Sequence, residues 1–242
     1  MISPFSSLNM SRSILKGIAF DLDDTLYLER DYVMSGFRAV AARIEEDFGI
    51  PSRKVLQELW RLFQRGVRGN TFDLWLSTQH ELAHKVSAHE LVGLYRSHKP
   101  EIELMPGTPG LLGYLRQRGM PLALISDGFL KSQQRKAKVL ELEKWIEIMI
   151  YTDAWGKPFW KPHARAFEEI MRLWSSGPER LVYVADNPEK DFVTPRRLGW
   201  KTVRLRLPAQ LRYRNDPFSV EYAAEVEVGS VEHLKGVLEE WL

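Results

Sequence analysis

Six short apolar runs, separated by stretches with helical periodicity, constrain the fold of this chain more than any other feature. The runs cover residues 14–20, 121–125, 145–151, 181–185, 201–207 and 224–228. Continuous apolar runs of this length are typical of strands buried on both faces of a parallel sheet. Amphipathic stretches at 108–118, 128–142, 163–173 and 231–242 alternate with them. This alternation predicts an α/β fold with a doubly wound, Rossmann-like parallel sheet.

A long segment between the first two runs breaks the alternation. Residues 31–105 are rich in leucine and aromatic residues and nearly free of strand patterns. Helices are expected at 32–48, 52–67, 71–76 and 88–98, the second of them capped by Ser52. We therefore expect a helical cap at 31–105, inserted into a core formed by 14–30 and 106–242. Residues 1–13 are expected to be a loose leader, in which Met10 is an alternative start.

The composition excludes several classes of protein. The chain of 242 residues carries a net charge of +2, which is too small to favour nucleic-acid binding. It has no cysteine, which excludes disulfides, thiol catalysis and cysteine-based zinc sites. No apolar stretch is long enough for a membrane span or a secretion signal. We therefore expect a cytoplasmic protein that binds neither nucleic acid nor membranes.

Acidic and polar residues lie where the predicted strands end. They are Asp21 and Asp23 after the first run, Ser126, Asp127 and Gly128 after the second, Lys161 in a loop, and Asp186 and Asp191 after the fourth. In open parallel sheets, ligands bind beyond the carboxyl ends of the strands. The sequence therefore predicts a single site at that edge of the sheet.

These residue types suit phosphoryl transfer from an ester. Asp21, at the end of the strand, can act as a nucleophile and form an aspartyl-phosphate, and Asp23 can act as general acid and base. Clustered carboxylates repel one another unless a cation lies among them, and Mg²⁺ prefers oxygen ligands. Ser126, the backbone amides around Asp127 and the lysine Lys161 can bind the phosphoryl group.

The same residues carry a resemblance to a known family. The pattern D-x-D-x-T occurs at Asp21, Asp23 and Thr25, and Ser126 follows an apolar strand. Lys161 is followed by Pro162 and Phe167, and an acidic motif contains Asp186, Asn187 and Asp191. From residue 14 to the C-terminus, this pattern resembles the haloacid dehalogenase-like hydrolase superfamily. The helical insert resembles the first class of cap found in that superfamily.

The resemblance implies a role for each matching residue. Asp21 would be nucleophile and Mg²⁺ ligand, Asp23 acid and base with its backbone carbonyl as a ligand, and Asp186 a further ligand. Ser126 and Lys161 would hold the phosphoryl group, and Asp191 would position the metal site or Lys161. Because dehalogenases of the family lack an acid at the Asp23 position, the resemblance favours a phosphatase that acts on a small-molecule phosphate monoester. A phosphomutase is the alternative.

Several other readings stay open at this point. Lys157 competes with Lys161, although its downstream spacing fits the motif less well. The sequence His80-Glu81-Leu82-Ala83-His84 fits the zinc-peptidase pattern H-E-x-x-H, but one isolated match is weak. Trp155 and Trp160 flank the lysine loop and are candidates to line the site. A noncatalytic interaction protein is also conceivable, and neither the substrate nor the oligomeric state follows from the sequence.

Overall fold

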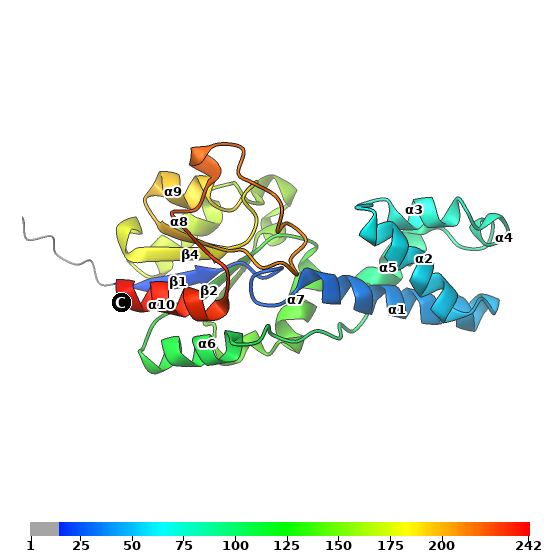
Figure 1. Ribbon diagram of the computed structural model, residues 1–242, viewed down its shortest axis with the longest axis horizontal. Coiled ribbons are helices and arrows are strands. Elements are labelled where there is room, and N and C mark those ends of the chain that lie inside the picture. The colour runs from blue at the N-terminus through cyan, green and yellow to red at the C-terminus, as the bar shows by residue number, and fades with distance from the viewer. Residues whose placement is uncertain (1–14) are drawn as a thin grey trace, which may run out of the picture.

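A six-stranded parallel sheet forms the centre of the computed structural model, which describes residues 15–242 (Figure 1). The strands are β1 (Gly17–Phe20), β2 (Leu122–Ser126), β3 (Ile148–Tyr151), β4 (Leu181–Ala185), β5 (Lys201–Leu205) and β6 (Val226–Val228). Their order in the sheet is β3-β2-β1-β4-β5-β6. The chain order reverses beside β1, because β2 lies on one side of it and β4 on the other. This is the position at which doubly wound sheets bind ligands.

Alternating side chains of the strands supply two separate layers of core. Ile18, Leu122 and Val182 face a cluster that also contains residues of α6 (Thr108–Gln117), α7 (Leu130–Val139) and α10 (Val231–Trp241). Their neighbours Ala19, Ala123 and Tyr183 face the opposite cluster, with residues from α8 (Arg165–Leu173) and beside α9 (Val193–Leu198). Helices thus cover both faces of the sheet, so the predicted doubly wound α/β fold is confirmed.

The segment between β1 and β2 is helical. It contains α1 (Glu29–Phe48), α2 (Ser52–Gln64), α3 (Thr71–Leu76), α4 (His80–Ala83) and α5 (Ala88–Ser97). These helices have their own apolar cluster, which includes Phe37, Leu59, Trp75 and Leu91. Figure 1 shows them extending away from the sheet, with α1 leading out of the core. We call α1–α5 the cap; the exact domain boundaries at residues 31 and 105 stay a prediction.

Several expected details differ in the structure. Ser52 does not cap α2: it is the first residue of the helix, Pro51 precedes it, and no side-chain hydrogen bond caps this end. The short helix α9 was not expected. The strand β3 begins at Ile148, later than the predicted residue 145, and a 3₁₀ turn at residues 142–144 precedes it. The predicted leader and the alternative start at Met10 lie outside the described residues. Within residues 15–242, no helix is long and apolar enough to cross a membrane.

Candidate active site

Asp21 lies directly beyond the C-terminal end of β1, at the centre of the sheet. Its backbone amide donates to the carbonyl of Val184 at 2.9 Å, which ties it to the end of the neighbouring strand β4. Its carboxylate accepts a hydrogen bond of 2.7 Å from Lys161 Nζ. Burial raises the pKa of Asp21 to about 6, although the Lys161 ammonium opposes this rise. Asp21 is therefore a buried carboxylate whose backbone is fixed by the sheet.

Lys161 is the lysine that reaches the sheet edge. Its Nζ lies 2.7 Å from Asp21 Oδ1, 2.9 Å from Asp191 Oδ1 and 2.8 Å from the hydroxyl of Tyr183. Burial alone would lower the pKa of Lys161, but Asp191 and Asp21 raise it well above its ordinary value. Lys157, by contrast, is exposed, and its Nζ lies 5.9 Å from the centre of the Trp160 ring. The geometry therefore favours Lys161 over Lys157.

Three buried carboxylates meet beside Lys161. One oxygen from each of Asp21, Asp186 and Asp191 lies within 4.8 Å of the other two. Asp186 Oδ2 is buried and has no hydrogen-bond partner among the described residues. Burial, and then the charges of Asp191, Asp24 and Asp21, raise the pKa of Asp186 well above its ordinary value. An orphaned carboxylate oxygen in an all-oxygen cluster is the donor set that a hard cation such as Mg²⁺ requires.

The side chain of Asp23 points away from that cluster and toward α7. It accepts hydrogen bonds of 2.6 Å from Lys136 Nζ and from Gln133 Nε2, and another from the Tyr27 hydroxyl. Burial alone would raise the pKa of Asp23, but Lys136 and the hydrogen bonds hold it below its usual value. Two carboxylates only two residues apart thus have opposite pKa shifts, because burial dominates for Asp21 whereas Lys136 and several hydrogen bonds dominate for Asp23.

The residues after β2 form the wall opposite Asp21. The Ser126 hydroxyl accepts a hydrogen bond of 2.8 Å from Gln133 Nε2, which also donates to Asp23 and to the Asp127 carbonyl. The Asp127 carboxylate accepts from the Thr152 hydroxyl at 2.7 Å and pairs with Lys190 Nζ at 2.6 Å. Gly128 has φ of 116°, a conformation that other residues rarely adopt. Hydrogen bonds and an ion pair thus fix the turn that follows β2.

Three further residues of the predicted motifs are buried around the site. Thr25 is 2% exposed, and its hydroxyl has no hydrogen-bond partner among residues 15–242. The Asn187 amide donates to Asp191 Oδ2 at 3.0 Å, while its side-chain oxygen accepts from the Glu189 amide at 3.0 Å. These bonds fix the loop after β4 and orient Asp191 toward Lys161.

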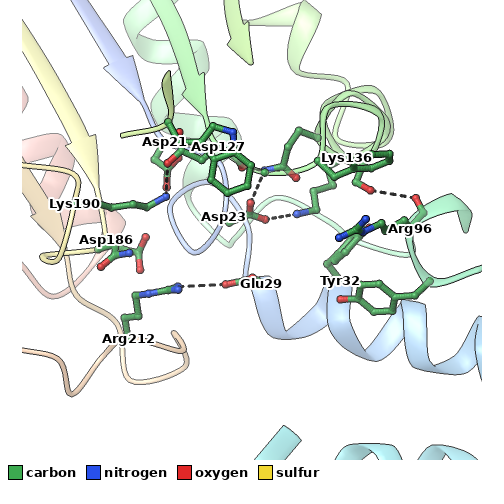
Figure 2. A pocket seen from close by; sticks show the side chains of 17 residues that line it. Asp21, Asp23, Glu29, Tyr32, Arg96, Asp127, Lys136, Asp186, Lys190 and Arg212 are labelled. Atoms are coloured by element: carbon green, nitrogen blue, oxygen red, sulfur yellow. Dashed lines mark hydrogen bonds and ion pairs between the residues drawn. The ribbon is translucent and has the colours of Figure 1, made fainter. Parts of the chain in front are cut away.

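A cavity of about 280 Å³ opens over these groups, between the core and the cap (Figure 2). The core contributes Asp21, Asp23, Asp127, Gly128, Asp186 and Asn187, and the cap side contributes Glu29, Tyr32, Tyr95 and Arg96. Trp160 lines the cavity, whereas Trp155 is not among its lining residues and instead lies under the Arg165 guanidinium at 4.3 Å.

Sequence reasoning missed five charged residues of this cavity. They are Glu29, Arg96, Lys136, Lys190 and Arg212. Lys136 and Lys190 pair with Asp23 and Asp127, and Arg212 pairs with Glu29 at 3.5 Å across the mouth (Figure 2). The available signal was weak: Lys190 stands next to Asp191 in the fourth motif, but Lys136 is one of several cations on its helix.

The zinc-peptidase pattern does not form a site. His80, Glu81 and His84 are exposed, and α4 is only four residues long. The metal-ligand cluster within the described part of the chain contains none of them.

Known proteins share this architecture. A family model described as haloacid dehalogenase-like hydrolase matches residues 15–199. The chain is 27% identical over 201 residues to a glyceraldehyde 3-phosphate phosphatase of Methanocaldococcus jannaschii, covering 79% of this chain and 85% of that one. It is 28% identical over 116 residues to a phosphoserine phosphatase of Thermus thermophilus, covering 48% and 46%.

Solved structures agree with the fold. A haloacid dehalogenase-family hydrolase of Deinococcus radiodurans with bound phosphate and sodium has a TM-score of 0.66 at 19% identity, covering 95% of this chain and 97% of that one. The putative hydrolase YfnB of Bacillus subtilis, bound to magnesium, has a TM-score of 0.64 at 20% identity, covering 93% and 99%. Together with the family match over residues 15–199, the fold and the carboxylate site lead to one conclusion: the chain belongs to the haloacid dehalogenase-like hydrolase family.

Proposed function

We propose that this protein is a magnesium-dependent phosphatase that hydrolyses a small-molecule phosphate monoester in two steps, through an aspartyl-phosphate on Asp21. One observation carries the proposal. Asp21, held by Lys161 and clustered with Asp186 and Asp191, shares a cavity with Asp23. The phosphatases among the relatives support the same reaction class. A cytoplasmic location stays a prediction.

The first step transfers the phosphoryl group to Asp21. A carboxylate oxygen of Asp21 attacks phosphorus, the bond from phosphorus to the ester oxygen breaks, and Asp23 gives that oxygen a proton. Lys161, the Ser126 hydroxyl and the amides around Gly128 bind the phosphoryl oxygens, where negative charge is concentrated. The Lys161 ammonium also keeps the Asp21 carboxylate ionised against the effect of its burial.

The second step releases phosphate. Asp23, now without its proton, takes one from a water molecule, which attacks the phosphorus of the aspartyl-phosphate. The bond from phosphorus to the Asp21 oxygen breaks, which restores the Asp21 carboxylate and frees inorganic phosphate. Lys136, Gln133 and Tyr27 keep Asp23 in position for both proton transfers.

The residues that would hold Mg²⁺ are Asp21 and Asp186, with the backbone carbonyl of Asp23, and Asp191 lies within the same cluster. The bound ion would neutralise charge on the phosphoryl oxygens and relieve the repulsion among the carboxylates.

Hydrolysis of an aryl phosphate with and without Mg²⁺ tests this proposal. We expect turnover that depends on Mg²⁺ and that falls by at least about 10³-fold in Asp21→Asn, because the neutral amide is not a nucleophile. The matched control is Asp73→Asn, an exposed aspartate on α3 that should keep full activity. Circular dichroism establishes that both variants are folded. Full activity in a folded Asp21→Asn variant would refute the mechanism.

A further inference from the structure

A second hollow, of about 440 Å³, lies beside the catalytic cavity, where α5 of the cap packs against α7 of the core. The cap contributes His89, Gly93 and Arg96, and the core contributes Phe129, Lys131 and Arg135. We call this hollow the basic groove. No aspartate or glutamate of residues 15–242 lines it.

The cations of the basic groove have no carboxylate partners within the described residues. Arg135 donates to the backbone carbonyl of Arg96 at 3.0 Å, and the Arg96 guanidinium lies over the Phe129 ring at 4.9 Å. Lys131 is exposed at the start of α7. Cationic side chains gathered without counter-charges create a locally positive field, which attracts anions.

The charged residues of the catalytic cavity are arranged differently. Lys136, Lys190 and Arg212 each pair with a carboxylate of the same cavity. Arg96 is the exception, since its guanidinium contacts an aromatic ring and no acid among residues 15–242. The surplus of positive charge around the cavity is therefore concentrated on the side of the basic groove.

Two residues join the hollows. Arg96 and Phe129 line both the catalytic cavity and the basic groove. Figure 2 shows Arg96 on the cap side of the catalytic cavity, near Tyr32 and Lys136. The two hollows are thus neighbours, and a ligand whose phosphoryl group lies at Asp21 would reach the basic groove by passing the side chains of Arg96 and Phe129.

We propose that the leaving group of the substrate carries a second anionic group, a carboxylate or a phosphate, which binds in the basic groove to Arg96, Lys131 and Arg135. This inference rests on the proposed phosphatase function and specifies its substrate class. The substrate is a phosphate monoester with two anionic ends, one for each hollow. The Phe129 ring supports the part of the molecule that connects them.

Three series of esters with graded chain length test the substrate class. Alkyl phosphates end in a methyl group, ω-carboxyalkyl phosphates in a carboxylate, and alkanediol bisphosphates in a second phosphate. We expect one chain length at which kcat/KM is about tenfold higher for an anionic end than for a methyl end, since several exposed cations each contribute modestly. This preference should shrink as salt screens the charges. The series that gains more identifies the anion as carboxylate or phosphate.

Variants locate the effect in the basic groove. Lys131→Gln should lower the preference for an anionic end about threefold. Lys138→Gln is the matched control, because Lys138 is an exposed lysine of the same helix that does not line the groove. Gly93→Glu introduces a carboxylate at the groove, at a position where an added Cβ meets no atom within 4 Å, and Gly93→Gln is its uncharged counterpart. Gly93→Glu should abolish the preference and Gly93→Gln should not.

Binding measurements distinguish a failure of this inference from a failure of the proposed function. Calorimetric titration with non-hydrolysable ω-carboxyalkyl phosphonates and alkyl phosphonates measures the preference without turnover. If no ester is hydrolysed but the anionic phosphonate binds more tightly, the result contradicts the proposed phosphatase reaction and supports the anion site in the basic groove. Equal binding and equal kcat/KM for anionic and methyl ends at every chain length would overturn the proposal that the basic groove binds a second anionic group. So would a preference that Gly93→Glu leaves intact.

Discussion

Lys136 is a single residue that connects the chemistry of the core to the cap. Its ammonium pairs with Asp23 at 2.6 Å and lies 4.1 Å from the centre of the Tyr32 ring on α1. Only 6% of its side chain is exposed, so this lysine is committed to the site and not to solvent. We therefore expect this lysine to position Asp23, the general acid and base of the proposed mechanism.

Replacing this lysine tests that role. In Lys136→Met, which keeps the length of the side chain, we expect kcat for an aryl phosphate to fall about 10- to 100-fold, because a misplaced general acid loses part of its usual contribution. KM should change less, since Lys161 and Ser126 still bind the phosphoryl group. Lys138→Met on the exposed face of α7 should leave both constants unchanged. An unaltered kcat in Lys136→Met would contradict the positioning role.

The predictability of individual site residues follows from their place in the chain. Asp21 and Asp186 could be predicted, because parallel strands bring their carboxyl ends to one edge whatever the details of packing. Lys136 could not. Lys131, Lys136 and Lys138 look alike in the sequence, and only the rotation of α7 against the core decides which of them is buried. Helix amphipathicity gives that rotation poorly when cations lie on both faces.

At the scale of elements, α1 and α5 are joined by a buried histidine. His98 ends α5, and its Nε2 lies 3.0 Å from the Ser35 hydroxyl of α1. The same hydroxyl accepts a hydrogen bond of 2.8 Å from the Glu101 amide, where the chain returns toward the core. Because Ser35 must accept from Glu101, its own hydrogen is available for an unprotonated His98 Nε2. The junction thus favours neutral histidine.

This junction predicts a pH dependence of stability. Burial lowers the pKa of His98 below its ordinary 6.5, and the charges of Lys136 and Arg135 act in the same direction, whereas the hydrogen bond to the Tyr95 carbonyl and the charge of Glu101 oppose it. The unfolded chain therefore takes up the proton first as pH falls. The stabilisation is complete above pH 6.5 and declines as pH falls below 6.5 toward the lowered pKa. In urea unfolding measured on both sides of this window, His98→Asn should lose less stability on acidification than the natural chain.

The control for this measurement is His84→Gln, which removes an exposed imidazole of the cap. It should retain the natural slope of unfolding free energy against pH. An identical slope in His98→Asn would show that the junction does not couple to protonation.

Elements differed in how well the sequence specified them. The bounds of β4 and α3 agree with prediction, because polar or turn residues flank each apolar segment. Helix packing could not be read in the same way. Gly36 lies within α1, where an added Cβ would come 2.4 Å from the Tyr95 ring of α5. Glycine inside a helix usually costs stability, and only the tertiary contact explains it here.

For the whole molecule, the cavity lies between two units that contribute different residues. The core supplies Asp21 and Asp186, directly after the central strands β1 and β4, whereas the cap supplies Tyr32, Tyr95 and Arg96. The alternation of strands and helices predicted this division. The particular cap residues at the cavity depend on how α1 and α5 cross the sheet edge, which no local pattern encodes.

We expect the carboxylate cluster to make the stability of the whole molecule depend on a cation. Asp21 follows β1 and Asp186 follows β4, so a bound ion would bridge the two central strands. Without Mg²⁺, Asp186→Asn should raise the thermal midpoint, because it removes a buried, unpartnered carboxylate that is repelled by its neighbours.

With Mg²⁺ the order should reverse. A ligand at 100 times its Kd stabilises the native state by about 2.7 kcal/mol. The natural chain should gain roughly this amount, and Asp186→Asn, with one charged ligand fewer, should gain much less. Thermal melts over a series of Mg²⁺ concentrations, with Ca²⁺ and Na⁺ in parallel, measure the crossing without any enzymatic assay. If the two chains respond equally to Mg²⁺, the cluster does not bind the ion through Asp186.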